Sequence, residues 1–147
     1  MECTKCGFAF YANPVPTATA VVTDEEGRIL LGRRAWEPDK DRWDLPGGFV
    51  DEGEHPLEAL KRELHEETGL EIEAGEFVGV WMDRYGYDSP ALSTLNLYWS
   101  ARVIAGEERP GDDVAELRWL PPDEIPWDDL AFEVNEKVLS AWIRRRL

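Results

Sequence analysis

The sequence predicts an α+β fold built around one main domain. Segments with strand character lie on both sides of a strongly helical segment, and a second amphipathic helix closes the 147-residue chain. A hydrophobic content of 43% and seven tryptophans are typical of a packed globular core rather than a disordered chain. A chain of this length can bury a substantial core. We therefore expect one domain over residues 14–147, preceded by a short extension over residues 1–13.

The first part of the main domain predicts a β-hairpin. Residues 17–23 are rich in β-branched side chains, residues 24–27 read as a turn, and residues 28–34 form the second arm. Arg33 and Arg34 end this second arm. Because neighbouring residues in a strand point to opposite faces, we expect only one of the two arginines to face a site, where it would bind substrate phosphate.

The segment of residues 48–70 predicts an acidic helix. Glu66 and Glu67 follow Glu63 by three and four positions, so the three carboxylates share one helix face. Clustered carboxylates repel one another, and hard divalent cations such as Mg²⁺ bind carboxylate oxygens. At this point two interpretations stay open, an ordinary acidic surface and a cation site.

The flanks of this segment fix where the helix begins and ends. Pro56 suits the first helical turn and Gly69 suits the C-terminal end. Glu54 is placed to reach back toward the helix. Residues 45–49 read as the end of a strand and a glycine-rich turn, and a strand, a glycine-rich loop and a helix together can bind a pyrophosphate.

The second half of the chain predicts further strands and a closing helix. Residues 71–82, 92–104 and 115–120 have strand character, and residues 84–91 form a loop rich in turn formers and tyrosines. Residues 130–146 carry apolar side chains at helical spacing.

Residues 48–70 resemble the Nudix box, in which fixed glycine, arginine, glutamate and aliphatic positions recur at set spacings. The sequence supplies every fixed position of that motif: Gly48, Glu54, Arg62, Glu63, Leu64, Glu66, Glu67, Gly69 and Leu70. The resemblance implies the Nudix α/β/α sandwich, a mixed sheet between helices. It also implies a hydrolase dependent on Mg²⁺ or Mn²⁺ that cleaves a diphosphate linkage in a nucleoside diphosphate linked to another moiety.

The resemblance assigns roles to particular residues. Glu63, Glu66 and Glu67, with the backbone carbonyl of Gly48, are the expected metal ligands. Glu66 or Glu67 is the candidate general base. Arg62 is expected to act in catalysis by orienting the carboxylates, because its guanidinium does not deprotonate. Three further carboxylates are held in reserve as catalytic candidates: Asp112, Asp113 and Glu133.

The expected substrate contacts lie before the helix and in the loop of residues 84–91: Arg33, Arg34, Trp43, Gly47, Gly48, Phe49 and Tyr85. Trp36, Trp43, Phe49 and Tyr85 are candidates for stacking on a base. In the family, a proline shortly past the box suggests ADP-ribose and a tyrosine suggests dinucleoside polyphosphates. This chain has both kinds of residue there, namely Tyr85, Tyr87 and Pro90.

Residues 130–133 look like the corresponding segment of ADP-ribose-type members, so ADP-ribose or a nucleoside diphosphate sugar is the first expectation, giving a nucleoside monophosphate. Two alternatives within the class are nucleoside triphosphates (house-cleaning) and NADH or dinucleoside polyphosphates. A non-catalytic module that senses a nucleotide is the alternative from another class.

Cys3 and Cys6 form a CxxC motif followed by Gly7, the kind of turn that supplies half of a tetrahedral zinc site. The segment resembles the second half of the zinc ribbon that precedes some Nudix domains. The sequence has only these two cysteines, and both histidines, His55 and His65, lie far along the chain. Three interpretations stay open: an inert remnant, zinc shared across a homodimer, and a disulfide or redox pair.

Charge and hydropathy exclude several classes of partner. A net charge of −15 argues against nonspecific nucleic-acid binding, which depends on neutralising phosphates with Lys and Arg. No apolar run approaches the ~20 residues of a membrane span, and the first residues do not resemble a signal peptide. We expect a cytoplasmic protein whose partner is a small-molecule nucleotide.

Overall fold

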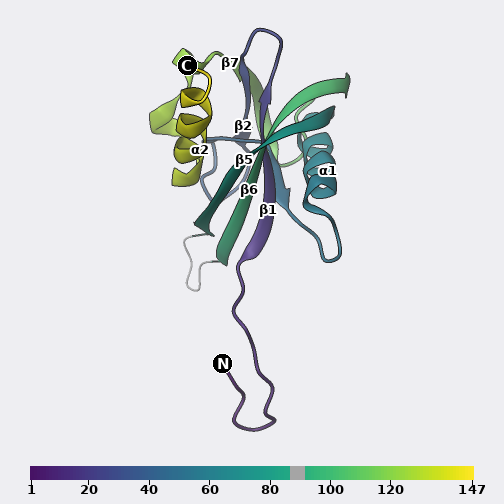
Figure 1. Cartoon of the computed structure of the whole chain (residues 1–147), viewed down its shortest axis with the longest axis vertical. Helices are drawn as coiled ribbons and strands as arrows, with labels where there is room; N and C mark the ends of the chain where they lie inside the picture. Colours follow the sequence, from purple (N-terminus) through teal and green to yellow (C-terminus); the bar gives the residue numbers. More distant parts are fainter. Residues whose placement is uncertain (87–91) are drawn as a thin grey trace.

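The computed structural model describes residues 1–86 and 92–147, in which one mixed sheet of seven strands lies between two helices (Figure 1). The strands are β1 (Val15–Thr23), β2 (Ile29–Arg34), β3 (Trp43–Asp44), β4 (Gly47–Phe49), β5 (Leu70–Tyr85), β6 (Leu92–Gly106) and β7 (Val114–Leu120). The helices are α1 (Pro56–Thr68) and α2 (Glu133–Arg144), with short 3-10 turns at Pro122–Glu124 and Trp127–Asp129. The predicted α+β class and the α/β/α sandwich are confirmed.

Strand β1 lies in the middle of the sheet. The order is β3-β2-β1-β6-β5, and β4 and β7 pair off this path with β1 and β2. β1 runs antiparallel to β2 and β4 but parallel to β6, with Thr17 opposite Asn96. The centre of the sheet therefore joins strands that are far apart along the chain.

The two faces of β1 belong to two separate hydrophobic cores. Ala18, Ala20 and Val22 lie in a core with Leu60 and Leu64 of α1. Val21, between them in sequence, lies in the other core, which contains the apolar side chains of α2. This alternation is what a strand buried on both faces requires, and it fixes α1 and α2 on opposite sides of the sheet (Figure 1).

Helix α1 has the bounds that its flanks predict. The His55 Nδ1 atom accepts a hydrogen bond from the backbone N–H of Leu57 at 3.1 Å, and Pro56 occupies the first helical position. Gly69 takes the left-handed conformation at φ 72°, and its N–H donates to the carbonyl of His65 at 2.8 Å. Neither α1 nor α2, the α-helices of the described residues, is long and apolar enough to cross a membrane.

Candidate active site

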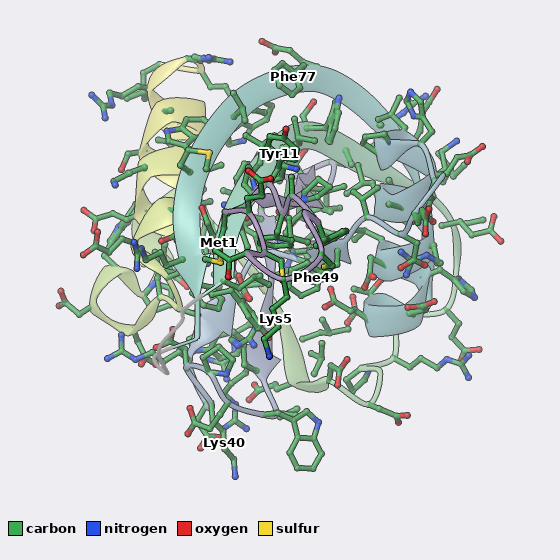
Figure 2. The ribbon with its side chains drawn as sticks, turned by 90° about the horizontal axis from the view of Figure 1, so that it is seen from below. Met1, Lys5, Tyr11, Lys40, Phe49 and Phe77 are labelled. Carbon is green, nitrogen blue, oxygen red and sulfur yellow. The ribbon has the colours of Figure 1, made fainter. Side chains whose placement is uncertain are left out.

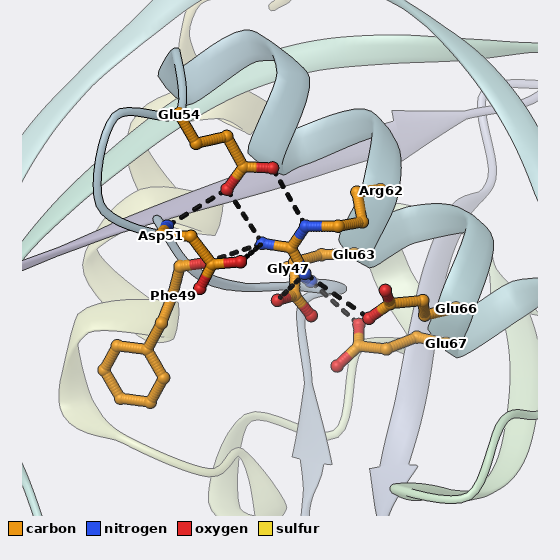
Figure 3. A network of polar contacts seen from close by, with 8 residues as sticks. All are labelled: Gly47, Phe49, Asp51, Glu54, Arg62, Glu63, Glu66 and Glu67. Carbon is orange, nitrogen blue, oxygen red and sulfur yellow. Dashed lines mark hydrogen bonds and ion pairs between the residues drawn. The ribbon is translucent and has the colours of Figure 1, made fainter.

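Arg62 of α1 holds carboxylates from both the preceding loop and its own helix (Figure 3). Its Nε and Nη2 atoms donate to the two carboxylate oxygens of Glu54, each at 2.9 Å. Its Nη1 atom donates to Glu63 at 2.7 Å and to Glu66 at 3.4 Å. Nη2 also donates to the backbone carbonyl of Phe49 at 3.0 Å. One guanidinium therefore joins the loop before α1 to two candidate metal ligands.

The contacts of Arg62 also shift the pKa values of the side chains that take part in them. Hydrogen bonds from Arg62, joined by the backbone N–H of Asp51, lower the pKa of Glu54 to about 2. Hydrogen bonds with Glu54 and Glu63 raise the pKa of Arg62. Because the guanidinium stays charged, Arg62 can orient carboxylates but cannot exchange a proton with a substrate.

Glu67 has a different environment at the end of α1. Its Oε2 atom accepts a hydrogen bond from the backbone N–H of Gly47 at 2.9 Å. Burial raises the pKa of Glu67 well above its usual value, and the negative charges of Asp44 and Glu63 raise it further. Burial also raises the pKa of Glu63. The side chain of Glu66, by contrast, is 57% exposed.

Two glycines allow α1 and the sheet to approach each other at this point. A Cβ atom on Gly48 would lie 2.4 Å from Cδ of Glu63. A Cβ atom on Gly47 would lie 2.4 Å from the carbonyl oxygen of Ala18 on β1. A side chain at Gly47 would collide with the backbone of β1, so this position requires glycine, whereas a side chain at Gly48 would displace the end of the Glu63 side chain. The missing side chain of Gly48 leaves the space that the Glu63 carboxylate occupies.

A cleft of about 370 Å³ opens beside these groups, and Glu63, Glu67 and both glycines line it. Buried polar side chains from β1 and β6 also line it. Thr17 Oγ1 donates to Asn96 Oδ1 at 2.7 Å, and Asn96 Nδ2 donates to Thr94 Oγ1 at 3.0 Å. The size suits a small molecule, and the lining offers polar groups that fix its orientation.

Aromatic rings gather around Arg34 in the lining of the same cleft. The guanidinium carbon lies 4.9 Å from the ring centre of Phe132 and 5.9 Å from that of Tyr85. Tyr85 also meets Phe49 edge to face, with ring centres 5.3 Å apart. All four residues line the cleft. Flat rings and a guanidinium plane are surfaces on which a nucleobase can stack.

Arg34 is fixed by a partly buried network that the sequence did not predict. Its Nη1 atom donates to Asp44 Oδ2 at 2.8 Å, and Asn135 Nδ2 donates to Asp44 Oδ1, also at 2.8 Å. Burial raises the pKa of Asp44, although Arg34 and Asn135 oppose the shift. Asn135 lies among the apolar residues Val134 and Val138 of α2. A polar residue within an apolar stripe was the signal that would have identified it, because burying an amide requires a partner.

Phe132 was also missed as a site residue. It precedes α2 with a φ of 57°, a conformation that a bulky L residue rarely adopts. The sequence gives no signal for this, since nothing in residues 130–133 requires a positive φ. Strained backbone of this kind clusters at functional sites.

Two predicted substrate contacts, Arg33 and Trp43, do not line the cleft. The alternation along β2 turns Arg33 away from the cleft, and its Nε atom lies 3.4 Å from Glu116. Trp43 is buried in the core on the α2 side, where the guanidinium of Arg118 lies 4.8 Å from its ring. Direct contact between these two side chains and a substrate in the cleft is therefore not proposed.

Two of the remaining candidate residues, Trp36 and Asp113, line the cleft. Trp36 is exposed, and its Nε1 atom donates to the carbonyl of Asp112 at 3.1 Å. Tyr87 and Pro90, two of the residues considered above as indicators of the substrate class, lie outside the described residues.

The donor chemistry of the α1 carboxylates fits Mg²⁺ or Mn²⁺, since Glu63, Glu66 and Glu67 offer only hard oxygen atoms. They are not gathered into a ligand group, however. Across residues 1–86 and 92–147, no cluster of three or more His, Cys, Asp or Glu side chains is arranged to hold a metal ion. Arg62 engages Glu63 and Glu66, and Gly47 engages Glu67. Binding an ion would compete with these contacts.

Comparison with known proteins identifies the family to which the chain belongs. The model of the NUDIX domain matches residues 13–142, nearly the whole chain. The chain belongs to the Nudix family. A crystal structure of a NUDIX hydrolase from Nitrosomonas europaea superimposes with a TM-score of 0.83 at 30% identity, covering 99% of this chain and 78% of the other.

Three curated relatives of this Nudix chain carry three different names. An RNA pyrophosphohydrolase of Cereibacter sphaeroides is 44% identical over 146 residues, covering 86% of this chain and 89% of the relative. An ADP-ribose pyrophosphatase of Methanocaldococcus jannaschii is 32% identical over 139 residues, covering 93% and 78%. An 8-oxo-(d)GTP phosphatase of Mycolicibacterium smegmatis is 37% identical over 108 residues, covering 74% of this chain but only 32% of the relative. The Nudix chain thus spans about a third of the length of the last relative.

Proposed function

We propose that this Nudix chain is a metal-dependent pyrophosphohydrolase that cleaves the diphosphate linkage of a nucleoside diphosphate bound to a second moiety. The proposal rests on one observation: two groups of residues with different chemistry line the same cleft. The carboxylates Glu63 and Glu67 line it together with the aromatic rings and the guanidinium of Arg34. A substrate that carries a diphosphate at one end and a base at the other can bind to both groups.

The proposed cofactor is Mg²⁺ or Mn²⁺, held by Glu63, Glu66 and Glu67 with the backbone carbonyl of Gly48. Such an ion, when bound, neutralises diphosphate charge and makes a bound water more acidic. Arg62 keeps the ligands oriented through the contacts described above.

Glu67 is the proposed general base. The backbone N–H of Gly47 donates to its Oε2 atom and orients the carboxylate, which in this role takes a proton from the attacking water instead of serving as a metal ligand. Burial raises the pKa of Glu67, so its ionised carboxylate is a stronger base toward water than an exposed carboxylate would be. Glu66 is the second candidate for the general base. Its side chain is 57% exposed and therefore lacks the buried surroundings of Glu67.

ADP-ribose or a nucleoside diphosphate sugar is the proposed substrate class. The rings of Phe49, Tyr85 and Phe132 supply a stacking surface for the base. The name of the Methanocaldococcus relative, which aligns with 93% of this chain, supports the same class. The name of the Mycolicibacterium relative favours nucleoside triphosphates as the second candidate.

The name of the Cereibacter relative raises RNA as a third candidate. The net charge of −15 argues against it, because an RNA chain presents many phosphates that would be repelled. A purely sensing module is disfavoured by the complete set of carboxylates on α1.

A hydrolysis panel in the presence and absence of Mg²⁺ tests the proposal. It should contain ADP-ribose, nucleoside diphosphate sugars, NADH, dinucleoside polyphosphates, nucleoside triphosphates and triphosphorylated RNA. Glu67→Gln serves as the inactive variant and Glu58→Gln, an exposed change on the same helix, as its matched control. Mg²⁺-dependent release of AMP from ADP-ribose, lost in Glu67→Gln alone, is the expected result. Tight nucleotide binding without turnover of any substrate would favour the sensing module instead.

A further inference from the structure

The first eleven residues form a small hairpin, here called the N-terminal knuckle (residues 1–11), that extends away from the body of the protein (Figure 1). The backbone N–H of Cys3 donates to the carbonyl of Phe8 at 2.7 Å, and that of Gly7 donates to the carbonyl of Cys3 at 2.9 Å. The N–H of Phe10 donates to the carbonyl of Met1 at 2.7 Å. The knuckle therefore has a defined backbone.

This ordered backbone has no core beneath it. Every residue of the knuckle is exposed, and Figure 2 looks along it, with Met1, Lys5 and Tyr11 over the middle of the molecule. The rings of Phe8, Phe10 and Tyr11 are 65%, 55% and 78% exposed. A two-stranded hairpin of this size is at best marginally stable alone in water, and natural miniature folds are held by a disulfide, a metal ion or a partner chain.

The two cysteines lie at the turn of the knuckle, where a metal ion can reach them. Both are free and exposed. The side chain of Cys6 lies close to the Cys3 thiol, within hydrogen-bonding reach. Two thiols close together at one turn can bind the same metal ion. Gly7 completes the turn with a φ of 72°.

We propose that the knuckles of two copies of this chain share one zinc ion, bound by Cys3 and Cys6 of each copy. A structural zinc site is tetrahedral and needs four ligands, and a knuckle offers two. The sequence contains no further cysteine, and the residues that the structure describes hold no metal-binding cluster of three or more side chains. A two-fold axis through the ion supplies the missing pair, because it repeats the same surface on both copies.

The same arrangement accounts for the exposed rings. Bringing two knuckles together around one ion places the rings of Phe8, Phe10 and Tyr11 next to their copies, where part of their surface would leave water. The site is structural, since all four positions around the ion are filled by sulfur. It is separate from the cleft, which no residue of the knuckle lines.

The test combines metal content with molecular mass. The full chain is produced with zinc in the medium and purified in reducing buffer without chelator. Metal analysis is expected to give about one zinc ion per two chains, and light scattering the mass of a dimer. A chelator is expected to remove the zinc and yield monomers, and added zinc to restore the dimer.

Variants of the knuckle sharpen the test. Cys3→Ser and Cys6→Ser are each expected to lose both zinc and dimer while keeping the same turnover of the substrate identified in the hydrolysis panel. Lys5→Ala, a change in the same turn that keeps the backbone N–H, is the matched control and is expected to retain both. Because turnover is measured separately, failure of this proposal is distinguishable from failure of the proposed function.

Four results would overturn the zinc-sharing proposal. They are zinc-free protein after growth with zinc, a zinc-loaded monomer, a disulfide between Cys3 and Cys6 in the reducing buffer, and a dimer that persists in both cysteine variants.

Discussion

Glu54 and Arg62 face each other through two parallel hydrogen bonds of equal length, 2.9 Å, across the start of α1. The same guanidinium reaches Glu63 through its third nitrogen. The loop before the helix and the candidate metal ligands are therefore positioned as one unit. Fork-to-carboxylate pairing of this kind gives geometric specificity that an ammonium group cannot supply.

The first prediction concerns Arg62→Lys. Lysine keeps the charge but loses the fork, so Glu63 and Glu66 are held less firmly. Turnover is expected to fall about 10- to 100-fold, as it does when partners that orient metal ligands are changed. Steady-state kinetics over a range of Mg²⁺ concentrations measures this effect. Arg28→Lys, in an ion pair near the turn of the first hairpin, is the control, and equal activity in the two variants would contradict the prediction.

The second prediction concerns Glu67→Gln. The amide oxygen can still accept the N–H of Gly47, but the side chain can no longer take a proton. Turnover is expected to fall about 100- to 10,000-fold, the range for loss of a general base. Because burial of the charged form costs stability in the wild type, the metal-free variant is expected to melt at the same temperature or higher. A large loss of thermal stability would show instead that the carboxylate supports the fold.

The third prediction concerns acid stability. Arg62 lowers the pKa of Glu54 from 4.5 to about 2, so the folded state favours the ionised form. The resulting stability is present above the unfolded-state pKa and is lost as the pH falls toward 2. Urea unfolding of metal-free protein should show wild type more stable than Glu54→Gln near pH 6, with the difference closing at lower pH. A difference independent of pH would rule out this linkage.

The fourth prediction concerns Gly48→Ala. The added Cβ would meet the Glu63 carboxylate at 2.4 Å, so the carboxylate must move. We expect a large loss of turnover with only a small change in the free energy of unfolding, because the displaced atoms are the end of a flexible side chain. Gly53→Ala is the control, because its φ of 77° is unfavourable for alanine but no atom lies within 4 Å of the new Cβ. Stability alone should fall in that variant.

The fifth prediction concerns Phe132→Ala. Removing this ring takes away one stacking surface beside Arg34 while leaving the α1 carboxylates in place. KM is expected to rise about tenfold or more, since base–aromatic stacking contributes about 1–3 kcal/mol, with a smaller change in kcat. Phe77→Ala, on a half-exposed ring outside the cleft, is the control. An unchanged KM would remove Phe132 from the substrate site.

Local patterns predicted much of this structure because their causes are local. The bounds of α1 follow from Pro56 and Gly69, which act within one helical turn, and the contact of Glu54 with the helix follows from its distance along the chain. The order of strands and helices also follows from hydrophobic periodicity. Hydrophobic periodicity was sufficient to predict the α+β class.

Features that depend on distant parts of the chain were not predicted. The parallel pairing of β1 with β6 and the contact of Asp44 with Asn135 are set by tertiary packing. Trp43 illustrates the same limit. Its position just before the box suggested a substrate contact, but a large apolar side chain beside a forming core is buried there instead.

The parallel pairing of β1 and β6 bears on how the chain acquires its cleft during synthesis. Thr17 and Asn96, which are 79 residues apart, meet only when β6 takes its place beside β1. A nascent chain that ends before β6 already contains the whole Nudix box, yet one edge of β1 is unpaired and part of the polar lining is missing. Until β6 arrives, that edge can pair with a strand of another chain. The interval between synthesis of the box and synthesis of β6 is therefore when aggregation competes most directly with folding.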